Sequence, residues 1–158
     1  MKQKALGIFV LFILLFMELP GFDITEKTAV ILPKKPLKSS ILAADELADY
    51  IKKVSGITLT KDKGKAENFI CIGLASDFEE IPSSLKKKLA GTKAEDSYIL
   101  YIKGNKIFFA GKSKTGELFA VYQFLEKELG IRFFKPANKM DPGEYIPSKK
   151  RSRITTVR

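Results

Sequence analysis

Short apolar runs bounded by turn residues predict the strands of a mixed sheet. Five such runs cover residues 24–32, 69–74, 98–102, 106–110 and 131–134. The third and fourth runs flank Gly104 and Asn105, and glycine in the first position of a two-residue loop favours a type II′ hairpin. A helical pattern separates the first two runs, which predicts a βαβ unit with parallel strands.

Two longer segments carry apolar residues at three- and four-residue spacing, which predicts amphipathic helices. These positions are Ala44, Leu47, Ala48, Ile51 and Val54 in the first helix, and Leu118, Val121, Tyr122, Leu125 and Leu129 in the second. Ser39 or Ser40 is the expected N-cap of the first helix, and Gly56 supplies its left-handed end. The second helix should begin near Thr115, with Glu117 in its first turn, and end at Gly130.

Together these elements predict an α/β two-layer sandwich, with two long helices packed on one mixed sheet of about five strands. A shorter helix is expected at residues 84–90. Four apolar side chains should face the sheet, namely Leu47, Ile51, Val121 and Leu125. The aromatic residues expected in the core are Phe108, Phe109, Phe119, Phe124, Phe133 and Phe134.

The N-terminal residues have the pattern of a signal peptide. Lys2 and Lys4 precede an apolar run over residues 5–17, which is too short to span a bilayer comfortably. A buried N-terminal helix or an uncleaved anchor is the alternative. The expected organisation is therefore a signal peptide at 1–21, a globular domain at 22–147 and a basic linker or tail at 148–158. We expect export to the periplasm, the cell envelope or the medium, without a stable membrane span after signal removal.

Composition narrows the chemistry that the chain can perform. The 158 residues fit one domain, and 28 Lys and Arg against 18 Asp and Glu give a formal charge of +10. Such a charge suits nucleic acid, an anionic envelope surface or a basic soluble protein. The chain has no His, so the commonest general base and metal ligand are missing. The single Cys71 lies in an apolar run and is expected in the core.

Several motifs in the chain occur together in one known family. They are Ala43–Leu47 (AADEL), Ser55-Gly56, Ile70–Gly73 (ICIG), Gly111, Lys114–Gly116 (KTG), Phe119–Tyr122 (FAVY), Phe124–Glu126 (FLE), Leu129–Phe134 (LGIRFF), Pro136 and Gly143–Pro147 (GEYIP). Their order over residues 24 to about 150 resembles the small N-terminal domain that precedes the catalytic barrel in some glycoside hydrolases. These are the family 67 α-glucuronidases and the family 20 hexosaminidases. The resemblance implies a domain without catalytic residues of its own.

The chain departs from this family at a few positions. Thr115 stands where Arg is frequent, Ala120 where Gly is frequent, and Phe133 where Trp is common. All three have the character of packing substitutions. Family members continue into a (β/α)₈ barrel that carries the paired catalytic carboxylates, and this chain ends at Arg158, where such a barrel would begin.

Residues 111–116 (GKSKTG) invite a phosphate-loop interpretation, but that motif would require glycine at position 106, which is Lys106. We expect turn and helix-cap chemistry here, with weak anion binding near Lys112 and Lys114 as the alternative. The basic segments at 86–88 and 149–153 lack interleaved aromatic residues and are expected to be solvated.

Acidic residues cluster at three places in polar loops. The clusters are Asp77, Glu79 and Glu80, then Glu95 and Asp96, then Asp141 and Glu144. A glycosidase needs two carboxyl groups that face each other across the scissile bond, and loop acids beside lysines do not predict such a pair. Glu126, in the Phe-Leu-Glu motif, is expected in an intrahelical or interdomain salt bridge. We therefore predict no catalytic residue, no cofactor-binding residue and no metal ligand.

The leading hypothesis is an exported, non-catalytic accessory domain of a carbohydrate-active protein, either truncated or stand-alone. Its expected partner is a catalytic barrel domain or a polysaccharide, and no specific nucleic acid. The alternative is a basic binding module for an anionic polymer, either acidic polysaccharide or nucleic acid. An autonomous glycosidase is a third hypothesis.

Overall fold

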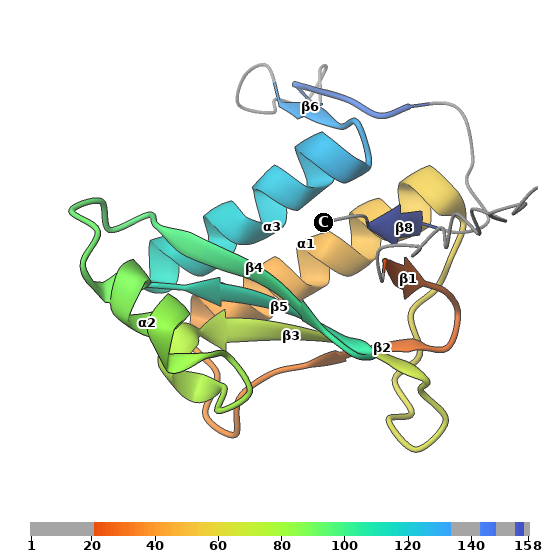
Figure 1. Cartoon of the computed structure of the whole chain (residues 1–158). Coiled ribbons are helices and arrows are strands. Elements are labelled where there is room, and N and C mark those ends of the chain that lie inside the picture. The colour runs from red at the N-terminus through yellow and green to blue at the C-terminus, as the bar shows by residue number, and fades with distance from the viewer. Residues whose placement is uncertain (1–20, 134–142, 148–153, 157–158) are drawn as a thin grey trace, which may run out of the picture.

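The computed structural model describes residues 21–133, 143–147 and 154–156 (Figure 1). Nearly all of the predicted signal peptide, together with Phe134, Asp141 and residues 149–153, lies outside this part of the chain. The strands are β1 (Phe22–Ile24), β2 (Thr28–Ile31), β3 (Asn68–Leu74), β4 (Tyr98–Lys103), β5 (Lys106–Gly111), β6 (Arg132–Phe133), β7 (Glu144–Tyr145) and β8 (Ile154–Thr156). The helices are α1 (Lys38–Ser55), α2 (Ser83–Ala90) and α3 (Lys114–Glu128), with a 3-10 turn at Ala75–Asp77.

The main sheet has the strand order β2-β3-β5-β4. β2 and β5 are parallel to β3, while β4 is antiparallel to β5 across the hairpin. Helices α1 and α3 lie side by side over one face of this sheet (Figure 1). The expected α/β class, mixed sheet and parallel βαβ unit are confirmed, but the sheet has four strands where about five were expected.

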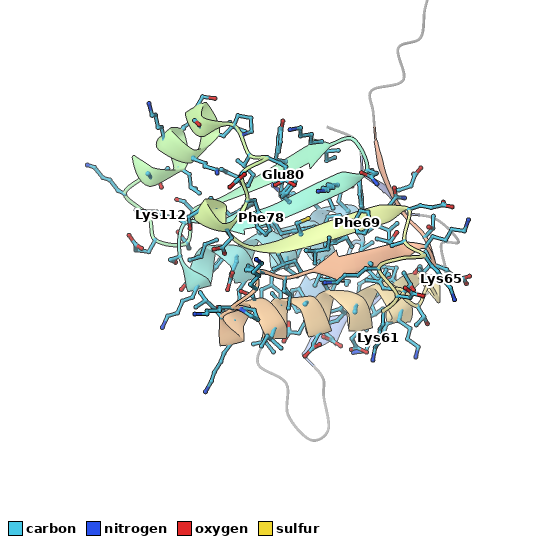
Figure 2. All side chains as sticks on the ribbon, turned by 90° about the horizontal axis from the view of Figure 1, so that it is seen from below. Lys61, Lys65, Phe69, Phe78, Glu80 and Lys112 are labelled. Carbon is cyan, nitrogen blue, oxygen red and sulfur yellow. The ribbon has the colours of Figure 1, made fainter. Side chains whose placement is uncertain are left out.

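Alternation along the central strands builds a core on both faces of the sheet. Ile70 and Ile72 of β3 pack with α1 and α3, whereas Cys71 points to the opposite face and packs near α2. The 3-10 turn and α2 cover that second face in part, and Figure 2 shows the sheet between α1 and α2. The short helix expected at residues 84–90 is confirmed as α2, and it adds a third helix to the two-layer arrangement.

Two strand predictions differ from the structure. The run at residues 24–32 contains two strands, because a turn before Thr28 separates β1 from β2. β1 pairs with β8, which lies within the predicted linker or tail. The expected fifth strand is β6, and it pairs with β7 away from the main sheet. Gly130, with a φ of 73°, turns the chain between α3 and β6.

Most element ends follow the expected local chemistry. Gly56 is left-handed, with φ 80°, and its N–H donates to Lys52 O at 2.9 Å. Gly104 has φ 57°, whereas no described non-glycine residue has a positive φ, as a type II′ turn at Gly104-Asn105 requires. The N-cap of α1 is Leu37, so the prediction of Ser39 or Ser40 is wrong. Both hydroxyls are used elsewhere, as described below.

The core prediction is confirmed for all four named aliphatic residues. Leu47, Ile51, Val121 and Leu125 are buried between the helices and the sheet. The aromatic residues divide into three outcomes: Phe108, Phe109 and Phe124 are buried, Phe133 is half-buried, and Phe119 is exposed. The prediction for Phe119 is wrong because it lies two residues after the buried Glu117, on the other side of α3. Cys71 is buried as expected.

Candidate functional site

A carboxylate lies in the interior where α1 and α3 begin. Glu117, in the first turn of α3, is 0% exposed and is the one fully buried charged side chain in the described part of the chain. Ser39 donates a hydrogen bond to its carboxylate, and the Ser40 hydroxyl lies 2.9 Å from Oε2. The positive end of the α3 dipole also favours a negative charge here. The carboxylate has no solvent access and its partners are hydroxyls of α1, so its hydrogen bonds connect the two helices.

The sequence prediction did not identify this buried acid. The sequence placed Glu117 only in the first turn of the expected helix. Its four-residue spacing from Val121 and Leu125 puts it on the buried face of that helix, where an apolar residue is the usual occupant. The sequence signal for this contact is a pair of serines at the start of one helix together with an acid on the apolar face of another. The signal is weak because the contact spans 77 residues of sequence.

The GKSKTG segment forms a tight turn and a helix cap, as expected. Ser113 is the N-cap of α3, and its Oγ accepts hydrogen bonds from the N–H groups of Thr115 and Gly116 at 3.2 and 3.4 Å. The amides that would hold an anion are therefore already occupied. A Cβ on Gly111 would lie 2.2 Å from Glu117 N, and one on Gly116 would lie 2.3 Å from Ser97 O. Glycine at both positions allows β5 and α3 to meet.

The loop acids are dispersed over separate contacts. Glu80 forms an ion pair with Lys106 at 2.8 Å, and this hydrogen bond lowers the pKa of Glu80. Glu95 pairs with Lys112 at 3.0 Å, on the rim of the turn. Asp77 Oδ2 accepts from Leu74 N at 2.8 Å and caps the 3-10 turn.

The other candidate acids are equally separate. Glu79 and Asp96 are exposed. The Glu126 carboxylate accepts a hydrogen bond from Gln123 at 3.4 Å and has no ion pair within the described residues. The expected salt bridge is therefore not seen in this part of the chain. No group of three or more potential metal ligands occurs among residues 21–133, 143–147 and 154–156.

An aromatic cluster packs the pair of strands β6 and β7 against the helices α1 and α3. The ring of Phe133 on β6 packs edge-on against Tyr50 of α1 and Tyr122 of α3, with centroid distances of 5.6 and 5.2 Å. Tyr50 donates a hydrogen bond to Glu144 of β7, and Tyr122 donates one to Glu46 of α1. Burial, followed by these hydrogen bonds, raises the pKa of both tyrosines. The cluster explains where Glu144 lies and gives it a structural role.

Exposed apolar side chains gather on the helix layer. Of the six large ones in the described chain, four belong to α1, its N-cap or α3. They are Leu37, Ile41, Leu42 and Phe119. Leu42 and Phe119 each lie two residues, about 200° of helix rotation, beyond the touching pair Ser40 and Glu117, so each points away from the contact that this pair makes between the helices. We call these two side chains, 48% and 45% exposed, the outer helix pair.

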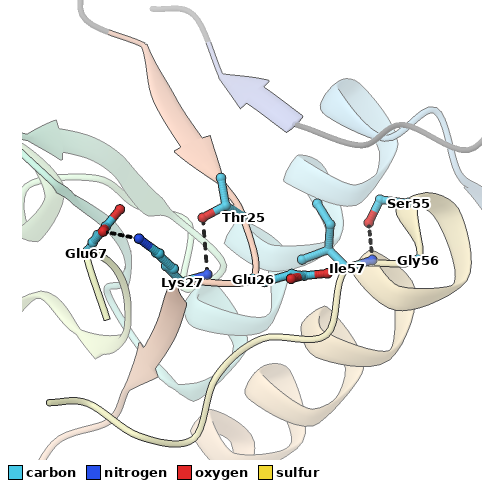
Figure 3. A pocket seen from close by; sticks show the side chains of 7 residues that line it. All are labelled: Thr25, Glu26, Lys27, Ser55, Gly56, Ile57 and Glu67. Atoms are coloured by element: carbon cyan, nitrogen blue, oxygen red, sulfur yellow. Dashed lines mark hydrogen bonds and ion pairs between the residues drawn. The ribbon is translucent and has the colours of Figure 1, made fainter. Parts of the chain in front are cut away.

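A wide hollow of about 580 Å³ opens beside the end of α1 (Figure 3). Its polar groups bind one another. Lys27 pairs with Glu67, Thr25 Oγ1 accepts from Lys27 N, and Ser55 Oγ accepts from Ile57 N. This hollow therefore holds no buried polar group that awaits a ligand in the part of the chain that is described.

No described helix is long and apolar enough to cross a membrane. No protein-family model matches the chain, and no curated protein matches it.

Proposed function

We propose that the chain is a non-catalytic accessory domain of an exported, carbohydrate-active protein of the glycoside hydrolase type. The observation that carries the proposal is the outer helix pair. Leu42 and Phe119 are large, apolar and about half exposed on the helix layer. Burying such side chains against another protein surface is favourable by about 25 cal/mol for each Å² removed from water. The proposed occupant of this surface is the catalytic barrel.

The separation of the carboxylates from one another favours a structural role for this domain over catalysis. A pair that works on one glycosidic bond stands roughly 5–10 Å apart across a shared space. Glu80 and Glu95 each form their own ion pair, with Lys106 and Lys112. Glu117 has no access to substrate. These three acids therefore make contacts within the fold.

The alternative function is a binding module for an anionic polymer. The distribution of positive charge supports it less than the observations above support an accessory domain. Five lysines in the described residues already pair with carboxylates: Lys27, Lys53, Lys65, Lys106 and Lys112. Figure 2 shows Lys112 near α2 and Lys61 and Lys65 at the opposite end of the sheet. A polymer track would need cations on one continuous stripe.

A photocrosslinker placed at position 119 tests the proposed docking. The residue p-benzoylphenylalanine replaces Phe119 in the protein as its own cells make it, and peptide mass spectrometry identifies the cross-linked sequence. We expect cross-links to a (β/α)₈ barrel, within the same polypeptide or in a partner. The matched control carries the crosslinker at Lys61, an exposed position at the other end of the sheet. Equal barrel labelling from both positions, or cross-links at 119 only to unrelated proteins, would refute the docking surface.

A further inference from the structure

A small cavity of about 250 Å³ lies on the face of the sheet that carries α2. It opens at the carboxyl ends of β3 and β5, where Leu74 and Gly111 are paired across the two parallel strands. Ligands of open α/β sheets bind at this edge, because the loops that leave the strands diverge there. The volume is below the range of pockets for drug-sized molecules, so an occupant must be smaller.

The walls of the cavity are mainly apolar. Ala75 and Leu89 belong to the buried cluster of the second face, and Ala90 adds a methyl group from α2. At Gly111 a side chain is excluded by the close approach of α3, so the backbone itself forms part of the lining. The hydroxyls of a sugar would find few hydrogen-bond partners on such walls. Burial of a hydrocarbon group there is favourable, because it removes apolar surface from water.

Two ammonium groups lie at this cavity, and they differ in their partners. Lys112 Nζ binds Thr92 O at 2.9 Å and Glu95 at 3.0 Å, so its position is set by the protein. Lys86 is half-buried, whereas its neighbours Lys87 and Lys88 are exposed. Lys86 pairs with none of the carboxylates in the described residues. An ammonium without a carboxylate partner, on a stem that lies beside an apolar wall, favours an anion that also carries a hydrocarbon group.

We infer that this cavity binds a small apolar carboxylate. Its hydrocarbon part packs against Ala75, Leu89 and Ala90, and its carboxylate accepts a hydrogen bond from the Lys86 ammonium. The site lies on the opposite face of the sheet from the outer helix pair, so a barrel docked on α1 and α3 leaves it open. The inference therefore stands or falls independently of the proposed accessory role.

Binding of benzoate by the purified protein tests the inference, with calorimetry and saturation-transfer NMR as readouts. We expect Lys86→Met, which keeps the length of the stem, to weaken benzoate binding about tenfold or more through loss of a charged hydrogen bond. Ala90→Phe, which adds a ring at the exposed edge of the cavity, should abolish binding. Benzyl alcohol has the same ring without the charge and should bind the unaltered protein about tenfold more weakly than benzoate.

Lys87→Met is the matched control on the next residue of α2, and it should leave the affinity unchanged. Circular dichroism checks that each variant is folded. Absence of benzoate binding in the unaltered protein would overturn the inference. Unchanged affinity in either folded variant, Lys86→Met or Ala90→Phe, would overturn it as well.

Discussion

Replacement of Leu47 by alanine tests the packing of α1 on the sheet. Leu47 is 0% exposed and lies in the main core cluster. The change removes three carbon atoms, worth about 2.4 kcal/mol of transfer free energy at about 0.8 kcal/mol for each group. Buried Ile70, Ile72 and Phe109 belong to the same cluster and cannot collapse fully into the space, so a cavity term is added. We expect a loss of unfolding free energy of about 3–4 kcal/mol, within the range of about 2–5 kcal/mol for such changes.

The matched control is Leu42→Ala, the same substitution on the same helix at a side chain that is 48% exposed. It should cost about 0.5 kcal/mol or less, because little apolar surface is returned to water. Urea unfolding followed by circular dichroism measures both variants, and an unchanged m-value shows that the two-state treatment holds. A loss below about 0.5 kcal/mol for Leu47→Ala, or equal losses in both variants, would show that the buried face of α1 is misassigned.

Three further predictions concern the buried acid, alkaline stability and export. Glu117→Gln should lower the unfolding free energy by about 1–3 kcal/mol, because one serine hydroxyl loses its acceptor. A denaturation midpoint equal to that of the parent protein would contradict a stabilising role for the hydrogen bonds between Glu117 and the serines of α1. Tyr50 and Tyr122 have raised pKa values in the folded state, so stability is fully present below about pH 10, where unfolded tyrosine begins to ionise, and is lost as the pH rises further. Urea midpoints across that range should fall, and should fall less in the double Phe variant; midpoints that rise with pH count against the sign. Mass spectrometry of the envelope fraction should find a species that begins near Phe22, whereas full-length protein found only in the cytosol would reject export.

Local signals in the sequence predict much of the fold. The spacing of Leu47 and Ile51 identifies α1, Gly56 ends it, and Gly104 marks the hairpin, because each depends on neighbours along the chain. Parallel pairing of β2 with β3 follows from the helix between them. These elements are predictable because backbone geometry and a single apolar face determine them.

Features that depend on distant segments are harder to predict. Ser39 and Ser40 have the chemistry of N-caps, but the approach of Glu117 from α3 gives their hydroxyls a different partner. Pairing of β1 with β8 joins the two ends of the described chain, and neither segment has a periodicity that identifies the other. The exposure of Phe119 follows from the rotation of α3, which the buried carboxylate at position 117 fixes.

The central claim, that this domain performs no glycoside hydrolysis by itself, is tested most directly by assaying the purified, folded protein on aryl glycosides and aryl glucuronides. We predict turnover no faster than that of the buffer, because Glu80 and Glu95 each pair with their own lysine and Glu117 is buried. Turnover that persists in folded Asp77→Asn, Glu79→Gln, Glu80→Gln and Glu95→Gln variants identifies a contaminating enzyme and leaves the prediction standing. Turnover that one of these substitutions abolishes, in a protein that keeps its circular dichroism spectrum, would contradict the account.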